Sequence, residues 1–163
     1  PVHLWNPPYR GEIDIRIAAD GTWFHEGGKI NRFELVKLFS SILRKDGDAY
    51  FLVTPVEKVG ISVDDAPFVA TDMTSNGEGA AQALNFETHV EDMVTADGDH
   101  PIRVSIDAET EEPSPYVMVR AGLEARIDRK TFYRMVELGV EQHGWFGVHS
   151  GGTFFPLIKS DAL

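Results

Sequence analysis

The chain of 163 residues has no cysteine. Disulfides, thiolate nucleophiles and Cys-ligated zinc or iron–sulfur sites are therefore excluded. No apolar run approaches the roughly 18 residues that a membrane-spanning helix needs. No basic-then-apolar leader occurs within residues 1–10, so we expect no export signal. Together these absences make a cytoplasmic location, without membrane binding, the default expectation.

The motifs of common enzymes and cofactor sites are missing as well. The chain has no G-x-x-x-x-G-K-[ST] phosphate loop and no G-x-S-x-G nucleophile motif. Its six histidines never pair at the i, i+4 spacing of a helical zinc site. Asp46-Gly47-Asp48 and Asp97-Gly98-Asp99 resemble fragments of calcium loops, but neither continues to a terminal Glu. We therefore expect no metal and no cofactor.

Basic residues are scarce in the middle of the chain. Residues 61–115 hold thirteen acids and one base, Arg103, whereas residues 1–60 hold eight of each and residues 116–163 hold five acids and six bases. The formal net charge of −11 opposes non-specific binding to duplex DNA and to anionic membranes. It leaves room for a small anion held by local arginines, and it would attract a basic protein partner.

What the sequence does contain is a repeat. Lys29-Ile30-Asn31-Arg32 and Arg126-Ile127-Asp128-Arg129 each open a segment with helical periodicity. Three apolar positions of the first segment recur 97 positions later in the second: Leu35, Leu38 and Phe39 correspond to Phe132, Met135 and Val136. A repeat of this kind predicts two related halves facing each other, and the seam between halves is a natural place for a pocket.

The pattern along the chain predicts one helix per half. Asn31 is expected to cap the first helix, which would extend through Ile42 and Leu43. Asp128 is expected to cap a second helix over residues 129–142. With roughly ten predicted strands, mostly antiparallel, the fold class is α+β. The predicted domains are residues 1–66, a strand–helix–strand domain, and residues 67–163, an antiparallel β domain with a helix.

Arginines are the most suggestive candidate site residues. Arg32 and Arg129 occupy equivalent positions at the starts of the two predicted helices, where free N–H groups attract anions. Arg120 and Arg126 would project from the hairpin around Ala121-Gly122. Arginine adds bidentate recognition of carboxylate or phosphate. The alternative is that each arginine pairs with an acid of the chain itself.

Aromatic and acidic side chains complete the candidate set. Trp23, Phe68 or Tyr116 could stack on a base, because an aromatic face accepts any base. Glu57 lies in an otherwise apolar segment and needs a partner if it is buried. Glu57 or Asp65 could serve as a general base, but the sequence shows no positioned catalytic partner for either carboxylate. For Glu57, a structural salt bridge is the simpler role.

Ordered sequence blocks give the chain a family resemblance. It resembles the bacterial family known as domain of unknown function 1285 through blocks in residues 11–68 and, more loosely, through Ala125–Arg129 and Phe132-Tyr133. The blocks of the first half are Gly11–Ile17, Asp20–Trp23, Ile30–Arg32, Leu35–Arg44, Leu52–Lys58 and Asp65–Phe68. The resemblance implies a duplicated core and a C-terminal half loosely like pleckstrin-homology folds. It also implies a ligand site at the domain interface, for a nucleic-acid-derived ligand, and a link to signalling; it implies no catalytic residues.

Three hypotheses follow. The first is a non-enzymatic regulatory or sensing module that binds a small anionic, nucleotide-like ligand between its halves. The second is a protein-interaction adaptor, in which the acidic segment steers a basic partner. The third is an enzyme with a carboxylate general base.

Overall fold

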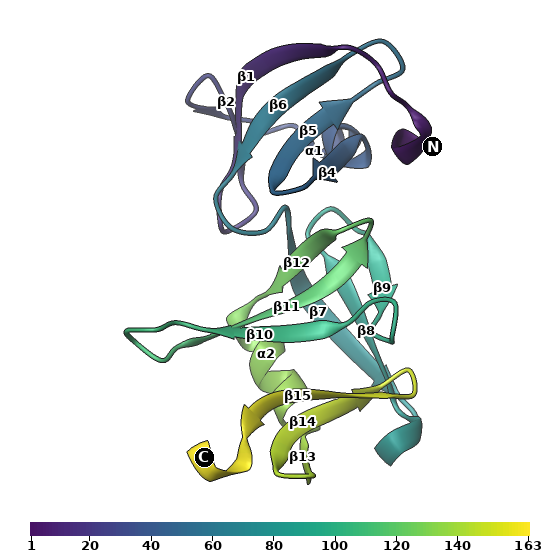
Figure 1. Cartoon of the computed structure of the whole chain (residues 1–163), viewed down its shortest axis with the longest axis vertical. Coiled ribbons are helices and arrows are strands. Elements are labelled where there is room, and N and C mark those ends of the chain that lie inside the picture. The colour runs from purple at the N-terminus through teal and green to yellow at the C-terminus, as the bar shows by residue number, and fades with distance from the viewer. The chain divides into compact units, whose positions relative to one another are not determined.

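The computed structural model describes residues 1–163 and divides into two compact units, shown in Figure 1. The first unit comprises residues 1–67 and 121–123. The second comprises residues 68–120 and 124–163.

The first unit is a six-stranded sheet with one helix. The strand order is β3-β2-β1-β6-β5-β4, in which β1 and β6 are parallel and the other neighbours are antiparallel. A short 3-10 helix, Val2–Leu4, precedes it. The elements are β1 (Tyr9–Ile17), β2 (Trp23–His25), β3 (Gly28–Lys29), α1 (Phe33–Ser41), β4 (Leu43–Asp46), β5 (Ala49–Val53) and β6 (Lys58–Val63).

Alternation along β1 explains how this unit builds its core. Ile15 and Ile17 are buried while Asp14 and Arg16 are exposed, as expected for a strand with one face against the interior. Trp23 packs into the same core and stacks on Phe39 of α1, with ring centroids 6.0 Å apart. The helix is therefore held to the unit by its apolar stripe.

The second unit contains another six-stranded sheet, in the order β10-β11-β12-β7-β8-β9. Its one parallel pair is β12 with β7. A small antiparallel sheet, β13-β14-β15, follows the helix α2. The elements are β7 (Phe68–Asn76), a 3-10 turn (Gly79–Ala81), β8 (Ala83–Thr88), β9 (Met93–Thr95), β10 (Ile102–Ile106), β11 (Pro113–Arg120), β12 (Leu123–Ile127), α2 (Arg129–Val136), β13 (Val140–Gln142), β14 (Trp145–Ser150), β15 (Thr153–Lys159) and a last 3-10 turn (Ser160–Ala162).

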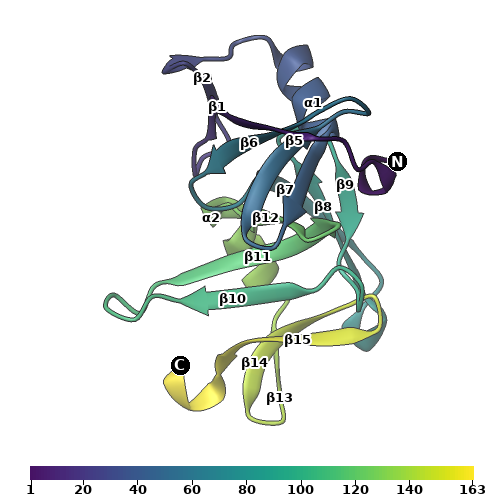
Figure 2. The ribbon, with the colours of Figure 1, turned by 45° about the horizontal axis from the view of Figure 1, so that its top comes forward.

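The small sheet is part of the packing of the second unit. Strand β15 contacts β10, and β14 contacts both α2 and β8; in Figure 2 β15 lies beside β10. No helix of the structure has the length and apolar character needed to cross a bilayer.

The core is duplicated, and the fold class is α+β, as predicted. Each unit has a six-stranded sheet with one parallel pair and one helix. In each, the helix is followed by three strands joined in an antiparallel meander. Leu43 and Val140, which lie 97 positions apart, begin β4 and β13, the first strands of the two meanders. The sequence repeat is thus a helix-plus-meander repeat.

The predicted limits of the first helix were wrong at both ends. Its N-cap is Arg32, not Asn31, and it has no side-chain cap hydrogen bond. The helix ends at Ser41, and Leu43 already belongs to β4. The hydroxyls of Ser40 and Ser41 donate to the carbonyls of residues 37 and 38 at 2.9 and 2.5 Å. Such local bonds compete with continued helix formation.

The second helix is capped as predicted but is shorter. The Asp128 carboxylate accepts a hydrogen bond from the Thr131 N–H at 3.0 Å, which confirms the cap. The helix ends at Val136 rather than residue 142, and residues 140–142 form β13. Gly139 follows shortly after this end, and a side chain there would collide with the Phe146 ring, which would lie 2.1 Å from its Cβ. The fifteen strands also exceed the predicted ten, because several strands have only two or three residues.

Candidate functional site

Three side chains form a row across neighbouring strands of the sheet in the second unit. Arg103 of β10 pairs in register with Tyr116 of β11, and its guanidinium carbon lies 4.3 Å from the ring centroid. Arg126 of β12 approaches the same ring at 5.7 Å. The row therefore spans three adjacent strands, with one aromatic ring contacting two guanidinium groups.

Strand alternation positions this row. Along β11, Tyr116 and Arg120 lie on one face of the strand, whereas Pro115, Val117 and Val119 lie on the other. Both faces are covered near the middle of the strand, since Tyr116 is buried like Pro115 and Val117. The Arg120 guanidinium carbon lies 5.1 Å from the centroid of the Phe68 ring. We call Arg103, Arg120 and Arg126 the arginine face.

Two carboxylates accompany these three cations. Glu124 of β12 accepts two hydrogen bonds from Arg103, each 2.8 Å long. Arg120 lies 3.8 Å from a carboxylate oxygen of Asp92, a longer and weaker ion pair. The bidentate pair fixes Arg103 in one orientation.

The three predicted stacking rings are all buried. Trp23, Phe68 and Tyr116 are 1%, 0% and 7% exposed. Trp23 is packed in the core of the first unit, and the other two rings are in contact with arginines. None of the three offers a free ring face to a ligand in this structure.

The two helix N-termini differ from the simple anion sites that the sequence suggested. Arg129 is exposed at the first position of α2. The Asp128 carboxylate already occupies that N-terminus, where it also accepts a hydrogen bond from Lys130 at 3.0 Å. Arg32 is exposed at the N-cap of α1, with Glu34 in the first turn. A carboxylate of the chain itself therefore lies at the start of each helix, where it competes with an external anion.

Glu57 belongs to a turn and not to an apolar strand. The turn is closed by a hydrogen bond from the Thr54 N–H to the Glu57 carbonyl at 2.9 Å, and Glu57 is exposed. Its side chain lies at the rim of an apolar cleft of ≈ 480 Å³ between α1 and the sheet. Asp65 is half-buried at the end of the same unit. The other residues that line the cleft are Ile13, Ile15, His25, Ile30, Leu35, Phe39, Ile42, Leu52, Thr54 and Val59.

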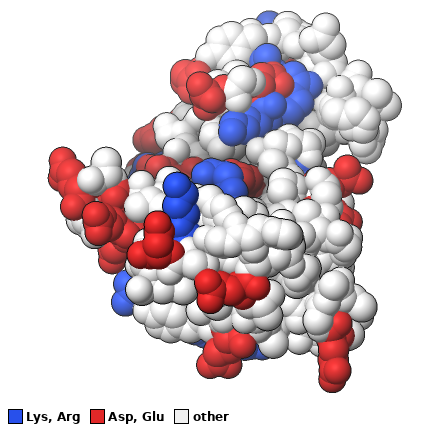
Figure 3. Space-filling model, turned by 60° about the horizontal axis from the view of Figure 1, so that its bottom comes forward, with Lys and Arg blue, Asp and Glu red and all other residues white.

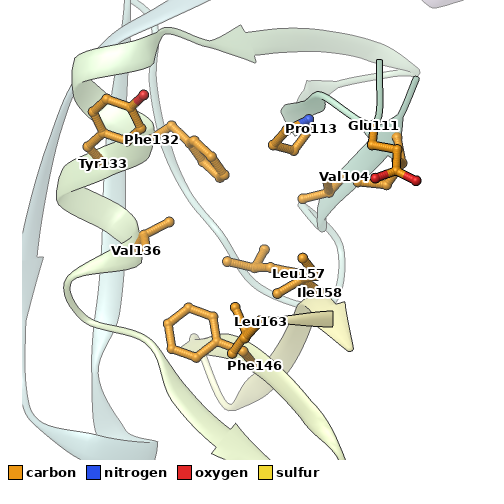
Figure 4. A pocket seen from close by; sticks show the side chains of 11 residues that line it. Val104, Glu111, Pro113, Phe132, Tyr133, Val136, Phe146, Leu157, Ile158 and Leu163 are labelled. Carbon is orange, nitrogen blue, oxygen red and sulfur yellow. The ribbon is translucent and has the colours of Figure 1, made fainter. Parts of the chain in front are cut away.

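A second apolar hollow, which we call the apolar pocket, lies in the second unit and has a volume of ≈ 210 Å³ (Figure 4). Phe132 and Val136 project into it from α2, Tyr133 lies at its edge, and Phe146 closes it from β14. The remaining lining residues are Val104, Ile106, Glu111, Pro113, Leu157, Ile158 and Leu163.

The structure brings four of the predicted residues together as two contacting pairs in the second unit. Arg120 contacts Phe68, and Arg126 contacts Tyr116. Trp23, Arg32, Glu57 and Asp65 belong to the first unit, and Arg129 is on α2. Arg103 was missed as a site residue. The sequence feature that could have identified Arg103 is that it is the one basic residue within the acidic residues 61–115. No group of three or more His, Asp or Glu side chains is arranged to hold a metal.

The fold and this site define a class: a two-unit α+β protein with a duplicated sheet-and-helix core and an arginine face on its second sheet. Family comparison agrees with the division into two units. Residues 1–66 match the family model "Domain of unknown function (DUF1285), N-terminal domain", and residues 67–157 match "Protein of unknown function (DUF1285), C-terminal domain". The chain belongs to the DUF1285 family.

Two solved structures of the same family resemble the chain. A DUF1285 protein from Silicibacter pomeroyi DSS-3 is 59% identical, with a TM-score of 0.97 over 99% of this chain and 88% of that one. A DUF1285 protein from Shewanella baltica OS155 is 30% identical, with a TM-score of 0.57 over 76% of this chain and 90% of that one. Among curated proteins, none matches the chain.

Proposed function

We propose that the chain is a non-enzymatic regulatory or sensing module that binds a small anionic ligand through the arginine face. The observation behind this proposal is the row Arg103–Tyr116–Arg126, in which one buried ring contacts two guanidinium groups on adjacent strands.

Preorganisation favours binding at this face. The contacts with Tyr116 and the bidentate bonds from Arg103 to Glu124 hold the guanidinium groups in place. Less side-chain entropy is then lost when a ligand binds. A guanidinium carries a planar fork of donors that matches a phosphate or carboxylate group, and at Arg103 one edge of this fork is occupied by Glu124.

Charge also favours a small anion here rather than a polyanion. The face gathers three guanidinium groups, whereas the whole chain has a net charge of −11. A nucleic acid duplex or an anionic membrane would be repelled by the rest of the protein, while a compact phosphate group interacts mainly with its immediate surroundings.

A nucleotide-like ligand would stack differently from the sequence-based expectation. Because the aromatic rings are buried, a base would have to stack on a guanidinium plane, which nucleic-acid-binding proteins also use. The Arg103 side chain suits this role, since it is 53% exposed while its position is fixed by Glu124. Phosphate would then be bound by Arg126 and Arg120.

A thermal-shift screen tests the proposal. The panel contains orthophosphate, pyrophosphate, mono-, di- and cyclic nucleotides, and adenosine as the uncharged control. A ligand at 100 times its Kd adds about 2.7 kcal/mol to the unfolding free energy, which raises the Tm by several degrees. We expect shifts with the phosphorylated compounds and none with adenosine.

Arginine variants locate the binding. Arg126→Ala should weaken binding about tenfold or more, because it removes charge-assisted hydrogen bonds to the anion. Arg10→Ala, an exposed arginine of the first unit, removes the same charge elsewhere and is the matched control. Equal affinity of the Arg126→Ala and Arg10→Ala variants would refute the assignment of the arginine face.

A further inference from the structure

The apolar pocket of the second unit has an exposed apolar rim. Ile106, Tyr133 and Leu163, which line it, are 50%, 59% and 75% exposed. Large apolar side chains gathered around a hollow mark an interaction site more often than scattered ones do. Figure 4 shows the aromatic ring of Phe132 and the side chains of Val136 and Leu157 directed into the space between α2 and the strands.

One edge of the pocket is strongly acidic. The turn between β10 and β11, residues 107–112, holds Asp107, Glu109, Glu111 and Glu112 and no basic residue. Its three glutamates are exposed and form no ion pair. Figure 3 shows acidic side chains gathered at this projecting turn, on the left. We call it the acidic turn.

The acidic turn and the pocket form one continuous surface. Glu111, at the centre of the turn, is itself a lining residue of the pocket. The turn has a defined conformation, because Asp107 accepts hydrogen bonds from the N–H groups of Glu109 and Thr110 at 2.9 and 2.8 Å. A ligand in the pocket would therefore lie against fixed negative charge on one side.

We propose that the apolar pocket and the acidic turn form a docking surface for a basic peptide segment of a partner protein, anchored by one large apolar side chain. The volume of ≈ 210 Å³ is below the range of about 300–1,000 Å³ for pockets that enclose whole small-molecule ligands. It suits one aromatic or branched aliphatic side chain. The four carboxylates complement lysines and arginines that flank this anchor.

Synthetic peptides test the surface on the intact chain. The probe is acetyl-Gly-Lys-Lys-Gly-Phe-Gly-Lys-Lys-Gly-amide, with one control in which Phe is replaced by Ala and another in which the lysines are replaced by Glu. We expect the first peptide to shift the backbone amide NMR signals of Val136, Leu157 and Glu111. The Ala peptide should bind about tenfold more weakly, since it lacks the large apolar side chain that the pocket would bury. The Glu peptide should not bind.

Charge variants distinguish the effect of the acidic turn on peptide affinity from the effect of the net charge of the protein. In the triple variant Glu109→Gln, Glu111→Gln, Glu112→Gln, the affinity for the Phe peptide should fall about fivefold at low salt, and its salt dependence should weaken. The matched control replaces the exposed Glu26, Glu34 and Glu78 by Gln, which gives the same net charge.

A pocket-filling variant tests the anchor. Val136→Trp should abolish the difference between the Phe and Ala peptides, while Val140→Trp, on an exposed residue outside the pocket, should preserve it. Equal binding of the Phe and Ala peptides to the unmodified chain would overturn the proposal. Equal loss of affinity in the two triple variants would also overturn it, as would signal shifts confined to residues outside the pocket.

Discussion

Ser150 joins three strand ends inside the second unit. Its fully buried hydroxyl accepts a hydrogen bond from the Leu84 N–H at 2.8 Å and donates one to the Ala96 carbonyl at 2.7 Å. Ser150→Ala would leave a buried donor and a buried acceptor unsatisfied. We expect a loss of about 1–3 kcal/mol of unfolding free energy by denaturant titration. The exposed Ser105→Ala should change it by less than about 0.5 kcal/mol, and a similar loss in both variants would refute this role.

Two glycines with equally close neighbours should differ in their tolerance of a methyl group. A Cβ at Gly147 would lie 2.3 Å from the Phe155 carbonyl oxygen, and one at Gly60 would lie 2.2 Å from a Glu12 carboxylate oxygen. The first neighbour is backbone, whereas the second is the end of a flexible side chain. Gly147→Ala should therefore cost about 2–3 kcal/mol and Gly60→Ala less than about 1 kcal/mol. Thermal unfolding of both variants checks the order, and the reverse order would contradict it.

At the scale of elements, Asp128 stabilises the start of α2 through its charge and its geometry. Burial alone would raise the pKa of Asp128, but hydrogen bonds from Thr131 and Lys130 outweigh it and lower the pKa below the ordinary 3.8. Asp128→Ala should cost about 1 kcal/mol at pH 7. Asp128→Asn keeps the cap acceptor and loses only the charge.

The pH dependence of these variants has a definite sign. Because the folded-state pKa of Asp128 is lowered, its charge stabilises the fold above the unfolded-state pKa, and this contribution is lost as the pH falls through the folded-state pKa. The Tm difference between the unmodified chain and Asp128→Asn should therefore be largest near pH 6 and should shrink as the pH falls below 3.8 towards the lowered folded-state pKa. A difference that is constant from pH 6 to pH 3 would contradict the assignment.

The elements also show which parts of the fold the sequence could predict. The repeat, the Asp128 cap and the α+β class follow from local patterns, and the structure confirms them. The positions where the helices end could not be predicted from these local patterns. The apolar spacing of Ile42 and Leu43 fits a helix, but Leu43 pairs with Leu52 of β5, a long-range contact that local periodicity cannot predict.

The candidate site was predictable only in part for the same reason. Arg120 and Arg126 flank the predicted hairpin, so their proximity could be inferred from the sequence. Arg103 lies on β10, and its register with Tyr116 depends on the length of the acidic turn. The burial of Phe68 and Tyr116 likewise depends on tertiary packing, which hydrophobicity alone does not separate from an exposed stacking role.

At the scale of the whole molecule, the lowered pKa values of several aspartates should reduce the unfolding free energy at acidic pH. The pKa values of six aspartates lie below the ordinary 3.8, mainly because neighbouring side chains or backbone N–H groups donate hydrogen bonds to the carboxylates: Asp20, Asp46, Asp72, Asp97, Asp107 and Asp128. At Asp46 and Asp128 these bonds outweigh an opposing effect of burial.

Each of these groups stabilises the fold above its unfolded-state pKa and loses that contribution as the pH falls through its lower folded-state pKa. The unfolding free energy should therefore fall below about pH 4, where the unfolded chain binds protons that the folded chain does not. Denaturant titrations at pH values from 7 to 3 measure this directly. A stability that rises on acidification through pH 4, as relief of the −11 net charge alone would predict, would contradict the account.

The central claim, recognition of a small anion at the arginine face, is tested most directly by isothermal titration of the intact chain with AMP and with adenosine. The account predicts saturable binding of AMP, no heat from adenosine, and a loss of AMP affinity of about tenfold or more in Arg126→Ala. Binding of adenosine as tight as that of AMP, or binding of AMP that is unchanged in Arg126→Ala, would contradict it.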